Sequence, residues 1–182
     1  MRAALALAVL LAAVPAAAQE GLFLSEAEAP AAVFPDADRF ERSEVEATPE
    51  LRARVQERLD GITPSLWEER YVVVRALRGE RLLGRAFVVE EIGKHRPITF
   101  VVGLGPDGVV EDVAVMAYRE VYGGEIRNGR FLVQYHGTRP ESPLRTYREI
   151  KNVAGATLSV DAANRAVRKA QALAAALGEP PP

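Results

Sequence analysis

The segment 98-ITFVVGLGPDGVVEDVAVMAY-118 decides the fold, because two apolar runs flank a tight-turn sequence. Ile98 to Leu104 and Val109 to Tyr118 are rich in valine and in other residues that favour strands. Gly105-Pro106-Asp107-Gly108 between them has the composition of a turn. The segment therefore predicts a β-hairpin.

Gly103 to Gly108 also matches the G-x-G-x-x-G string of dinucleotide-binding folds. In those folds the string opens a helix, so that a pyrophosphate meets the helix N–H groups. Here the string precedes Val109 to Val113, which is strand-like. We therefore assign no nucleotide to it.

Two further strands are expected before the hairpin. Tyr71 to Leu77 is rich in valine, Arg78-Gly79-Glu80 is a turn, and Leu82 to Ile92 forms the second strand. Gly84 in that second strand favours a bulge. Four such runs predict an antiparallel sheet.

Helix signals lie on both sides of these strands. Thr48-Pro49-Glu50 has a capping residue, a proline suited to the first helical position and an acid for the first turn. A last helix is expected from near Ser159, with Arg165, Arg168 and Lys169 off its apolar stripe. The expected fold class is α+β: a single domain in which an antiparallel sheet of about four strands carries an N-terminal and a C-terminal helix.

Residues 1–18 have the pattern of a secretory signal peptide. Met1-Arg2 is a short basic start, Ala3 to Val14 is apolar and uncharged, and Ala16-x-Ala18 fits a cleavage site before Gln19. The alternative is an uncleaved membrane anchor, but a spanning helix usually needs about 20 apolar residues. We expect a mature chain that works outside the cytoplasm, in the periplasm. Residues 19–92 are expected to form an N-terminal extension with a helix and the first strands, and its lead-in, residues 19–47, to lie over the surface.

Composition excludes several classes of function. Without Arg2 the mature chain has 22 basic and 25 acidic residues, a formal charge of −3, which does not favour nucleic acid as a partner. The chain has no cysteine, which excludes disulfides, iron–sulfur clusters and thiolate zinc sites. Glu90-Glu91 and Glu111-Asp112 are expected to be solvated strand ends or edges. We assign no catalytic and no metal-binding residue.

Val153 to Ser159 carries the most informative chemistry. A glycine turn at Gly155 presents the hydroxyl of Thr157 just ahead of the last helix. Helix starts collect unpaired N–H groups and the positive end of the macrodipole, so they favour an anion. Thr157 is therefore well placed to carry a phosphate. The alternative is that it only helps to cap the helix.

Five blocks follow one another in the second half of the chain: Gly93 to Phe100, the hairpin with Pro106-Asp107-Gly108, Arg119 to Gly124, Phe131 to Gly137, and Gly155-Ala156-Thr157 with the closing helix. In this order they resemble the FMN-binding domain family. That family includes the covalently flavinylated subunits of sodium-pumping NADH:quinone reductases and of Rnf-type electron-transport complexes. The resemblance implies that residues 93–178 form an FMN-binding domain.

In those relatives FMN hangs from the threonine through its phosphate, which implies the same role for Thr157. Two positions depart from strongly flavinylated relatives: Lys151 replaces an aspartate six residues before the threonine, and Ala154 replaces a serine or threonine. A pairing of Lys151 with the phosphate is one hypothesis. The remaining cofactor-binding candidates are Gly155, Ala156, Glu120, Tyr122, Gly123 and Gly124.

The flavin ring is expected among aromatic side chains and close backbone. Tyr118, Tyr122, Phe131 and Tyr135 are candidates for its surroundings, with ordinary core packing as the alternative. Gly123 and Gly124 would let the backbone approach closely.

The resemblance implies an electron-transfer carrier rather than an enzyme. A flavin transferase would take FMN from FAD and join it to Thr157, and redox partners outside or within the membrane would supply and accept electrons. Two alternatives stay open: non-covalent FMN at the same site, and a secreted binding or adaptor module that has lost its flavin.

Overall fold

The structure, a computed structural model, describes residues 21–178; the predicted signal peptide lies outside the described residues. The helices are α1 (Ala29–Val33), α2 (Pro49–Arg58), α3 (Gly129–Leu132) and α4 (Thr157–Leu177), with short 3₁₀ turns η1 (Gly124–Arg127) and η2 (Val133–Tyr135). The strands are β1 (Arg39–Glu46), β2 (Arg70–Arg78), β3 (Arg81–Ile92), β4 (Pro97–Leu104) and β5 (Val110–Tyr118). Within residues 21–178 no helix has both the length and the apolar character needed to cross a bilayer.

The five strands form one antiparallel sheet in the order β1-β2-β3-β4-β5. The predicted hairpin is confirmed: β4 and β5 pair around a turn in which the Gly108 N–H donates to the Gly105 carbonyl. The register between β2 and β3 shifts where Ala76 faces Gly84 and Leu77 faces Leu82, which confirms the bulge. The α+β class is also confirmed, with five strands where about four were expected.

The additional strand is β1, in the segment expected to lie over the surface. It pairs with β2 at the edge of the sheet, and its side chains are mostly exposed. Its sequence, RFERSEVE, is charged and lacks an apolar face, so the alternation that reveals a half-buried strand is missing. Charged residues on an edge strand also discourage pairing with another chain.

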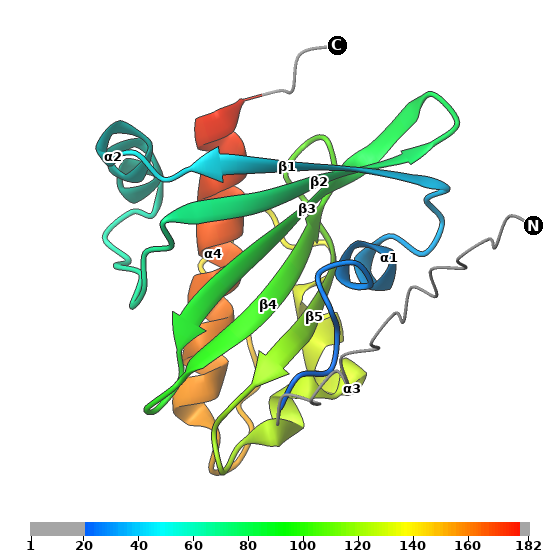
Figure 1. The fold of residues 1–182 in the computed structure, drawn as a ribbon. Coiled ribbons are helices and arrows are strands. Elements are labelled where there is room, and N and C mark those ends of the chain that lie inside the picture. Colours follow the sequence, from blue (N-terminus) through cyan, green and yellow to red (C-terminus); the bar gives the residue numbers. More distant parts are fainter. Residues whose placement is uncertain (1–20, 179–182) are drawn as a thin grey trace, which may run out of the picture.

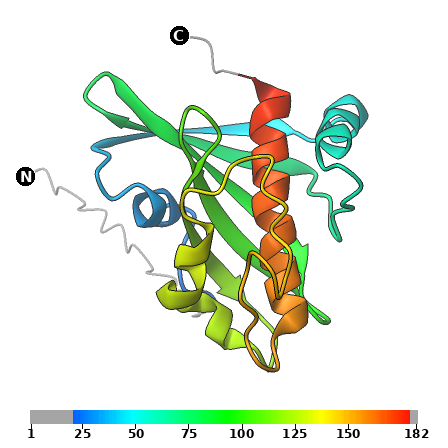
Figure 2. The same ribbon diagram turned by 180° about the vertical axis from the view of Figure 1, so that it is seen from behind.

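Helices cover both faces of the sheet (Figures 1 and 2). The long helix α4 lies across one face, where its apolar stripe packs with α2 against residues such as Phe87 and Phe100. The short helix α1 lies on the opposite face, where Val33 and Phe34 pack on Val101 and its neighbours. These two apolar layers place the sheet in the middle of the molecule.

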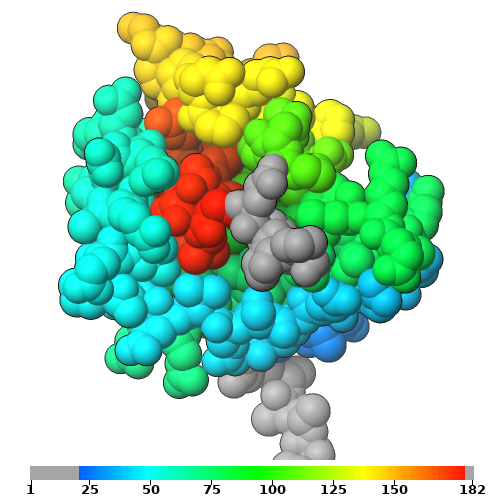
Figure 3. Space-filling view, turned by 90° about the horizontal axis from the view of Figure 1, so that it is seen from above, coloured from blue at the N-terminus to red at the C-terminus, as the bar shows by residue number. Residues whose placement is uncertain are grey.

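The helix signals in the sequence are confirmed at both ends. The Thr48 hydroxyl accepts from the Leu51 N–H and caps α2. Helix α4 begins at Thr157, two residues before the predicted start. Figure 3 shows its C-terminal end, in red, between the cyan segment around α2 and the yellow segment that follows η2. This enclosure explains why α4 is buried on nearly every side.

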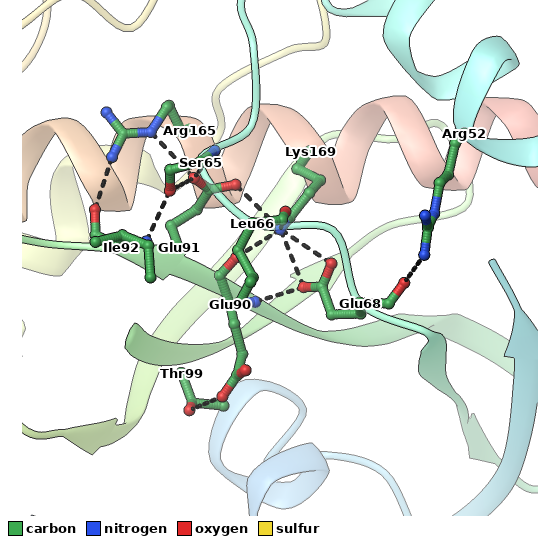
Figure 4. A network of polar contacts seen from close by, with 10 residues as sticks. All are labelled: Arg52, Ser65, Leu66, Glu68, Glu90, Glu91, Ile92, Thr99, Arg165 and Lys169. Atoms are coloured by element: carbon green, nitrogen blue, oxygen red, sulfur yellow. Dashed lines mark hydrogen bonds and ion pairs between the residues drawn. The ribbon is translucent and has the colours of Figure 1, made fainter. Parts of the chain in front are cut away.

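A buried polar network joins α4 to the strands and to the segment before β2 (Figure 4). The Lys169 ammonium, fully buried, lies 3.0 Å from Glu68 Oε1 and 3.0 Å from Glu91 Oε1. Glu91 Oε2 accepts from Ser65 and from Arg165, whose Nε lies 3.0 Å away. The expectation that Glu91 is a solvated strand end was therefore wrong: its exposure is 0 %, and its charge is balanced by two cations of α4.

Candidate functional site

A hollow of about 480 Å³ lies where the end of β5, the turn before β4 and the start of α4 meet. In Figures 1 and 2 the start of α4 and the segment after β5 lie side by side at the same end of the molecule. The residues that line the hollow are Lys94, His95, Glu120, Val121, Tyr122, Gly155, Ala156, Thr157, Leu158 and Ser159. Two larger hollows, of about 640 and 690 Å³, have linings that do not include Thr157.

Thr157 is the first residue of α4, and its hydroxyl does not cap the helix. The N-cap position belongs to Ala156, and no side chain within the described residues makes a capping bond there. The first amides of a helix have no intrahelical acceptor, so those of Thr157, Leu158 and Ser159 remain available at the rim of the hollow. The structure therefore removes the capping alternative and leaves a hydroxyl beside an anion-favouring helix start.

Gly155 supplies the turn that precedes this hydroxyl. Its φ of +77° lies in the left-handed region, where glycine is far less hindered than other residues. Apart from Gly155 and its two chain neighbours, no atom of the described residues lies within 4 Å of a Cβ built on Gly155. Space beside Thr157 therefore stays open on the side of the hollow.

Sequence reasoning missed two side chains that contact Thr157. Asn152 Nδ2 donates to Thr157 Oγ1 over 2.9 Å and to the Tyr147 hydroxyl over 2.8 Å. The Tyr147 hydroxyl lies 3.3 Å from Thr157 Oγ1. Both residues lie in the connection between η2 and α4, and no pattern in the sequence shows that this connection folds back onto the start of α4.

The end of β5 is fastened to the start of α4 by a tyrosine. The Tyr118 hydroxyl donates to the Tyr122 carbonyl and lies 3.0 Å from Ser159 Oγ. Burial raises the pKa of this phenol, and the hydrogen bond with Ser159 only partly opposes the effect. Tyr118 therefore acts as a buried brace for the site and does not line the hollow.

Glu120 holds the opposite wall of the hollow. Its Oε1 accepts from the His95 N–H over 2.5 Å and from the Arg96 N–H over 2.8 Å. Partial burial works to raise the pKa of this carboxyl, but the backbone N–H groups of His95, Arg96 and Lys94 together outweigh it, and the pKa is lowered. The charged carboxylate thus fixes the turn that carries Lys94 and His95.

The other predicted aromatic residues divide into two groups. Tyr122 lines the hollow and is 82 % exposed, next to Val121 at 85 %. Phe131 and Tyr135 pack edge to face in the core, with ring centroids 5.8 Å apart, and the Tyr135 hydroxyl donates to Asn164. For these two residues the core-packing alternative holds.

Among the described residues, four of the predicted cofactor-binding residues do not line the hollow. Gly123 packs against Ala156, and Gly124 begins η1. Lys151 and Ala154 are exposed, and the Lys151 backbone N–H donates to Gln134 Oε1 over 2.8 Å. Lys94 supplies a cationic side chain on the wall of the hollow.

A comparison with protein families finds a match in the part of the chain that forms the hollow. The model of the FMN-binding domain family matches residues 93–172. The match includes every residue that lines the hollow and the first sixteen residues of α4. No curated protein matches the chain.

Proposed function

We propose, from the premise that residues 93–172 form a domain of the FMN-binding domain family, that Thr157 carries FMN through a phosphodiester and that the protein transfers electrons outside the cytoplasm. FMN as the cofactor follows from the family itself. Covalent attachment, electron transfer and location are the proposal. One observation carries it: the Thr157 hydroxyl stands at the rim of the hollow without a capping role.

The residues around Thr157 fit a phosphate ester. The helix start offers unpaired N–H groups and the positive end of the macrodipole, and Lys94 adds a positive charge on the facing wall. The open space beside Gly155 leaves room for the group that the ester would bring. A hollow of this size also lies within the usual range for cofactor sites, about 300–1,000 Å³.

Attachment is a group transfer with FAD as the donor and a flavin transferase as the catalyst. Thr157 Oγ1 attacks the phosphorus on the FMN side of the FAD pyrophosphate. The Oγ1–P bond forms as the bridging P–O bond breaks, AMP leaves with the bridging oxygen, and the hydroxyl proton passes to a base of the transferase. No electron is gained or lost in this step.

Bound FMN supplies a ring system that accepts and donates electrons. The chain supplies its surroundings: Val121, Tyr122 and Leu158 give the hollow an apolar side, and Lys94 and Glu120 give it charge. The high exposure of these apolar side chains leaves an approach for redox partners. With no cysteine in the sequence to hold an iron–sulfur cluster, electrons are exchanged with other proteins or with a diffusible carrier.

The extracytoplasmic part of the proposal rests on residues 1–18. Covalent attachment suits that location, because it prevents loss of the cofactor where flavin is scarce. N-terminal sequencing of the protein from cells should give Gln19 as the first residue. An intact Met1 on a membrane-embedded product would count against it.

An absorption spectrum separates the three readings of the site. The protein is expressed together with a flavin transferase, denatured, and desalted before the measurement. We expect flavin absorbance to remain with the denatured chain. Absorbance that appears only in the small-molecule fraction would indicate non-covalent FMN, and a colourless native protein would indicate a binding module without flavin.

A further inference from the structure

We infer that Asn152, braced by Tyr147, is the positioning residue that presents the Thr157 hydroxyl for flavin transfer. The inference rests on the proposed attachment at Thr157. Its starting point is the pair of hydrogen bonds that the Asn152 amide donates, one to Thr157 Oγ1 over 2.9 Å and one to the Tyr147 hydroxyl over 2.8 Å. Thr157 is thereby held in one orientation before any cofactor arrives.

The direction of these bonds suits a nucleophile. An amide N–H can only donate, so it occupies one lone pair of Thr157 Oγ1 and stabilises the negative charge that develops as the proton leaves. The Tyr147 hydroxyl, 3.3 Å away, can accept a hydrogen bond from the Thr157 hydroxyl. This bond would direct the second lone pair of Thr157 Oγ1 away from the connection. After transfer, Oγ1 is an ester oxygen that only accepts, and the Asn152 N–H still fits it.

The backbone at Tyr147 is strained in the way that functional sites often are. Its φ is +68°, which is uncommon for any residue other than glycine. Such conformations are unfavourable and persist where the surroundings hold them. Here the strain brings the Tyr147 hydroxyl over the start of α4, although the side chain is 72 % exposed.

Contacts on both sides keep this connection in place. The Thr146 hydroxyl bonds to Asp161 and accepts from Asn164 Nδ2 over 2.9 Å, so two residues of α4 hold it. Gln134 holds the other end through the Lys151 N–H. The Asn152 amide is therefore presented by a fixed frame, as preorganised sites require.

The Asn152 carbonyl gives a second indication that stability has been sacrificed for position. Asn152 Oδ1 is buried and has no hydrogen-bond partner among residues 21–178. An unsatisfied buried acceptor lowers the stability of the folded state. Both hydrogen bonds of the Asn152 amide are made by Nδ2.

Asn152 lies within the segment where this chain departs from strongly flavinylated relatives. Lys151 and Ala154 flank it in place of an acid and a hydroxyl residue, and both are exposed outside the lining of the hollow. Asn152 and Tyr147 supply the polar contacts to the threonine that neither replacement makes. Other residues of this chain thus hold the Thr157 hydroxyl in position.

The test measures the rate of flavin loading by intact mass. Protein made in cells without a flavin transferase is mixed with purified transferase and FAD, and the concentration of the protein is varied. Asn152→Ala should lower the maximal rate by about ten- to a hundredfold, since a misplacement near 1 Å can cost about that much. The concentration for half-maximal rate should not change, because the contact that is lost lies within the chain.

Three further variants make the result specific. Asn152→Asp keeps the shape but removes the N–H donors, so it should be as slow as Asn152→Ala. Tyr147→Phe removes one exposed hydroxyl and should be slower than wild type by a smaller factor. Asn128→Ala removes the amide that caps α3 through the Arg130 N–H, and it should load at the wild-type rate.

Each outcome decides something different. Wild-type maximal rates for Asn152→Ala or Asn152→Asp, or a change in the half-maximal concentration alone, would overturn the positioning role while attachment stands. Equal slowing of Asn128→Ala would show that general destabilisation is the cause. Wild-type protein that gains no mass would refute attachment itself, and with it this role.

Discussion

A Cβ built on Gly123 would lie 2.9 Å from the Cβ of Ala156 and 2.8 Å from the Tyr118 hydroxyl. Gly123 also has a φ of +87°. Glycine therefore lets the segment after β5 close against the residue that precedes Thr157. This contact sets the shape of the hollow from one side.

Gly123→Ala should destabilise the protein and reduce flavin loading. The added methyl overpacks the contact with Ala156, which typically costs about 1–3 kcal/mol, and the left-handed backbone adds strain. Urea unfolding of the flavin-free protein measures the loss. Gly129→Ala is the control. Apart from Gly129, its chain neighbours and the backbone of its own helix, no atom of the described residues lies within 4 Å of a Cβ built there. Equal stability of the two variants would contradict the argument.

Gly155→Val should abolish flavin loading. A β-branched residue strongly resists a φ of +77°, so the turn would shift and move Thr157. Gly61→Val is matched to it: Gly61 has a φ of +81° and equally open surroundings, but it lies after α2, far along the chain from Thr157. Both variants should lose comparable stability in thermal unfolding, and only Gly155→Val should fail to gain mass with transferase and FAD. Normal loading of Gly155→Val would refute the role of the turn.

Lys169→Met should be strongly destabilising. Removal of the buried ammonium leaves the Glu68 and Glu91 carboxylates without their shared partner, and breaking a buried pair costs about 3–5 kcal/mol. Arg42→Met breaks the exposed ion pairs with Glu26 and Glu44, which solvent screens, so its loss of stability should be much smaller. Urea unfolding of both variants tests the difference. Similar losses would mean that the network in Figure 4 contributes little.

The Arg145–Glu149 pair should break, and so loosen the connection before α4, only in strong acid. Hydrogen bonds from the Arg145 side chain, and then from its backbone N–H, lower the pKa of Glu149 to about 2. Because the folded pKa lies below the unfolded one, the contribution to stability is complete above about pH 4.5 and is lost as the pH falls toward 2. The Arg145 amide, which donates to Glu149 Oε2, should titrate in NMR spectra with a midpoint near pH 2. A midpoint near the ordinary value of glutamate would show that the pair is not formed in solution.

The sequence was sufficient where local patterns and tertiary structure agree. The valine-rich runs, the Pro106-Asp107-Gly108 turn and the Thr48 cap each predict an element that the structure contains. Strand β1 was missed because its charged side chains face solvent, so that pairing with β2 alone defines it. Glu91 was misplaced because its partner, Lys169, is far along the chain and no local pattern links the two.

The site was predictable only in part for the same reason. Gly155-Ala156-Thr157 is a contiguous block, and the structure places all three residues on the hollow. Asn152 and Tyr147 reach Thr157 through a folded connection with a left-handed residue, and no spacing rule predicts that geometry. Lys151, which was predicted from the sequence, lies in the same segment, but its side chain is not the one that contacts Thr157.

The intact mass of the protein with and without the Thr157 hydroxyl tests the central claim most directly. Thr157→Val keeps the β-branched shape and removes a hydroxyl that does not cap α4, so the loss of stability should be only about 0.5–1.5 kcal/mol. Co-expressed with a flavin transferase, wild type should show the mass of one FMN ester, Thr157→Ser some of it, and Thr157→Val none. An FMN increment on Thr157→Val, or its absence from wild type, would contradict the account.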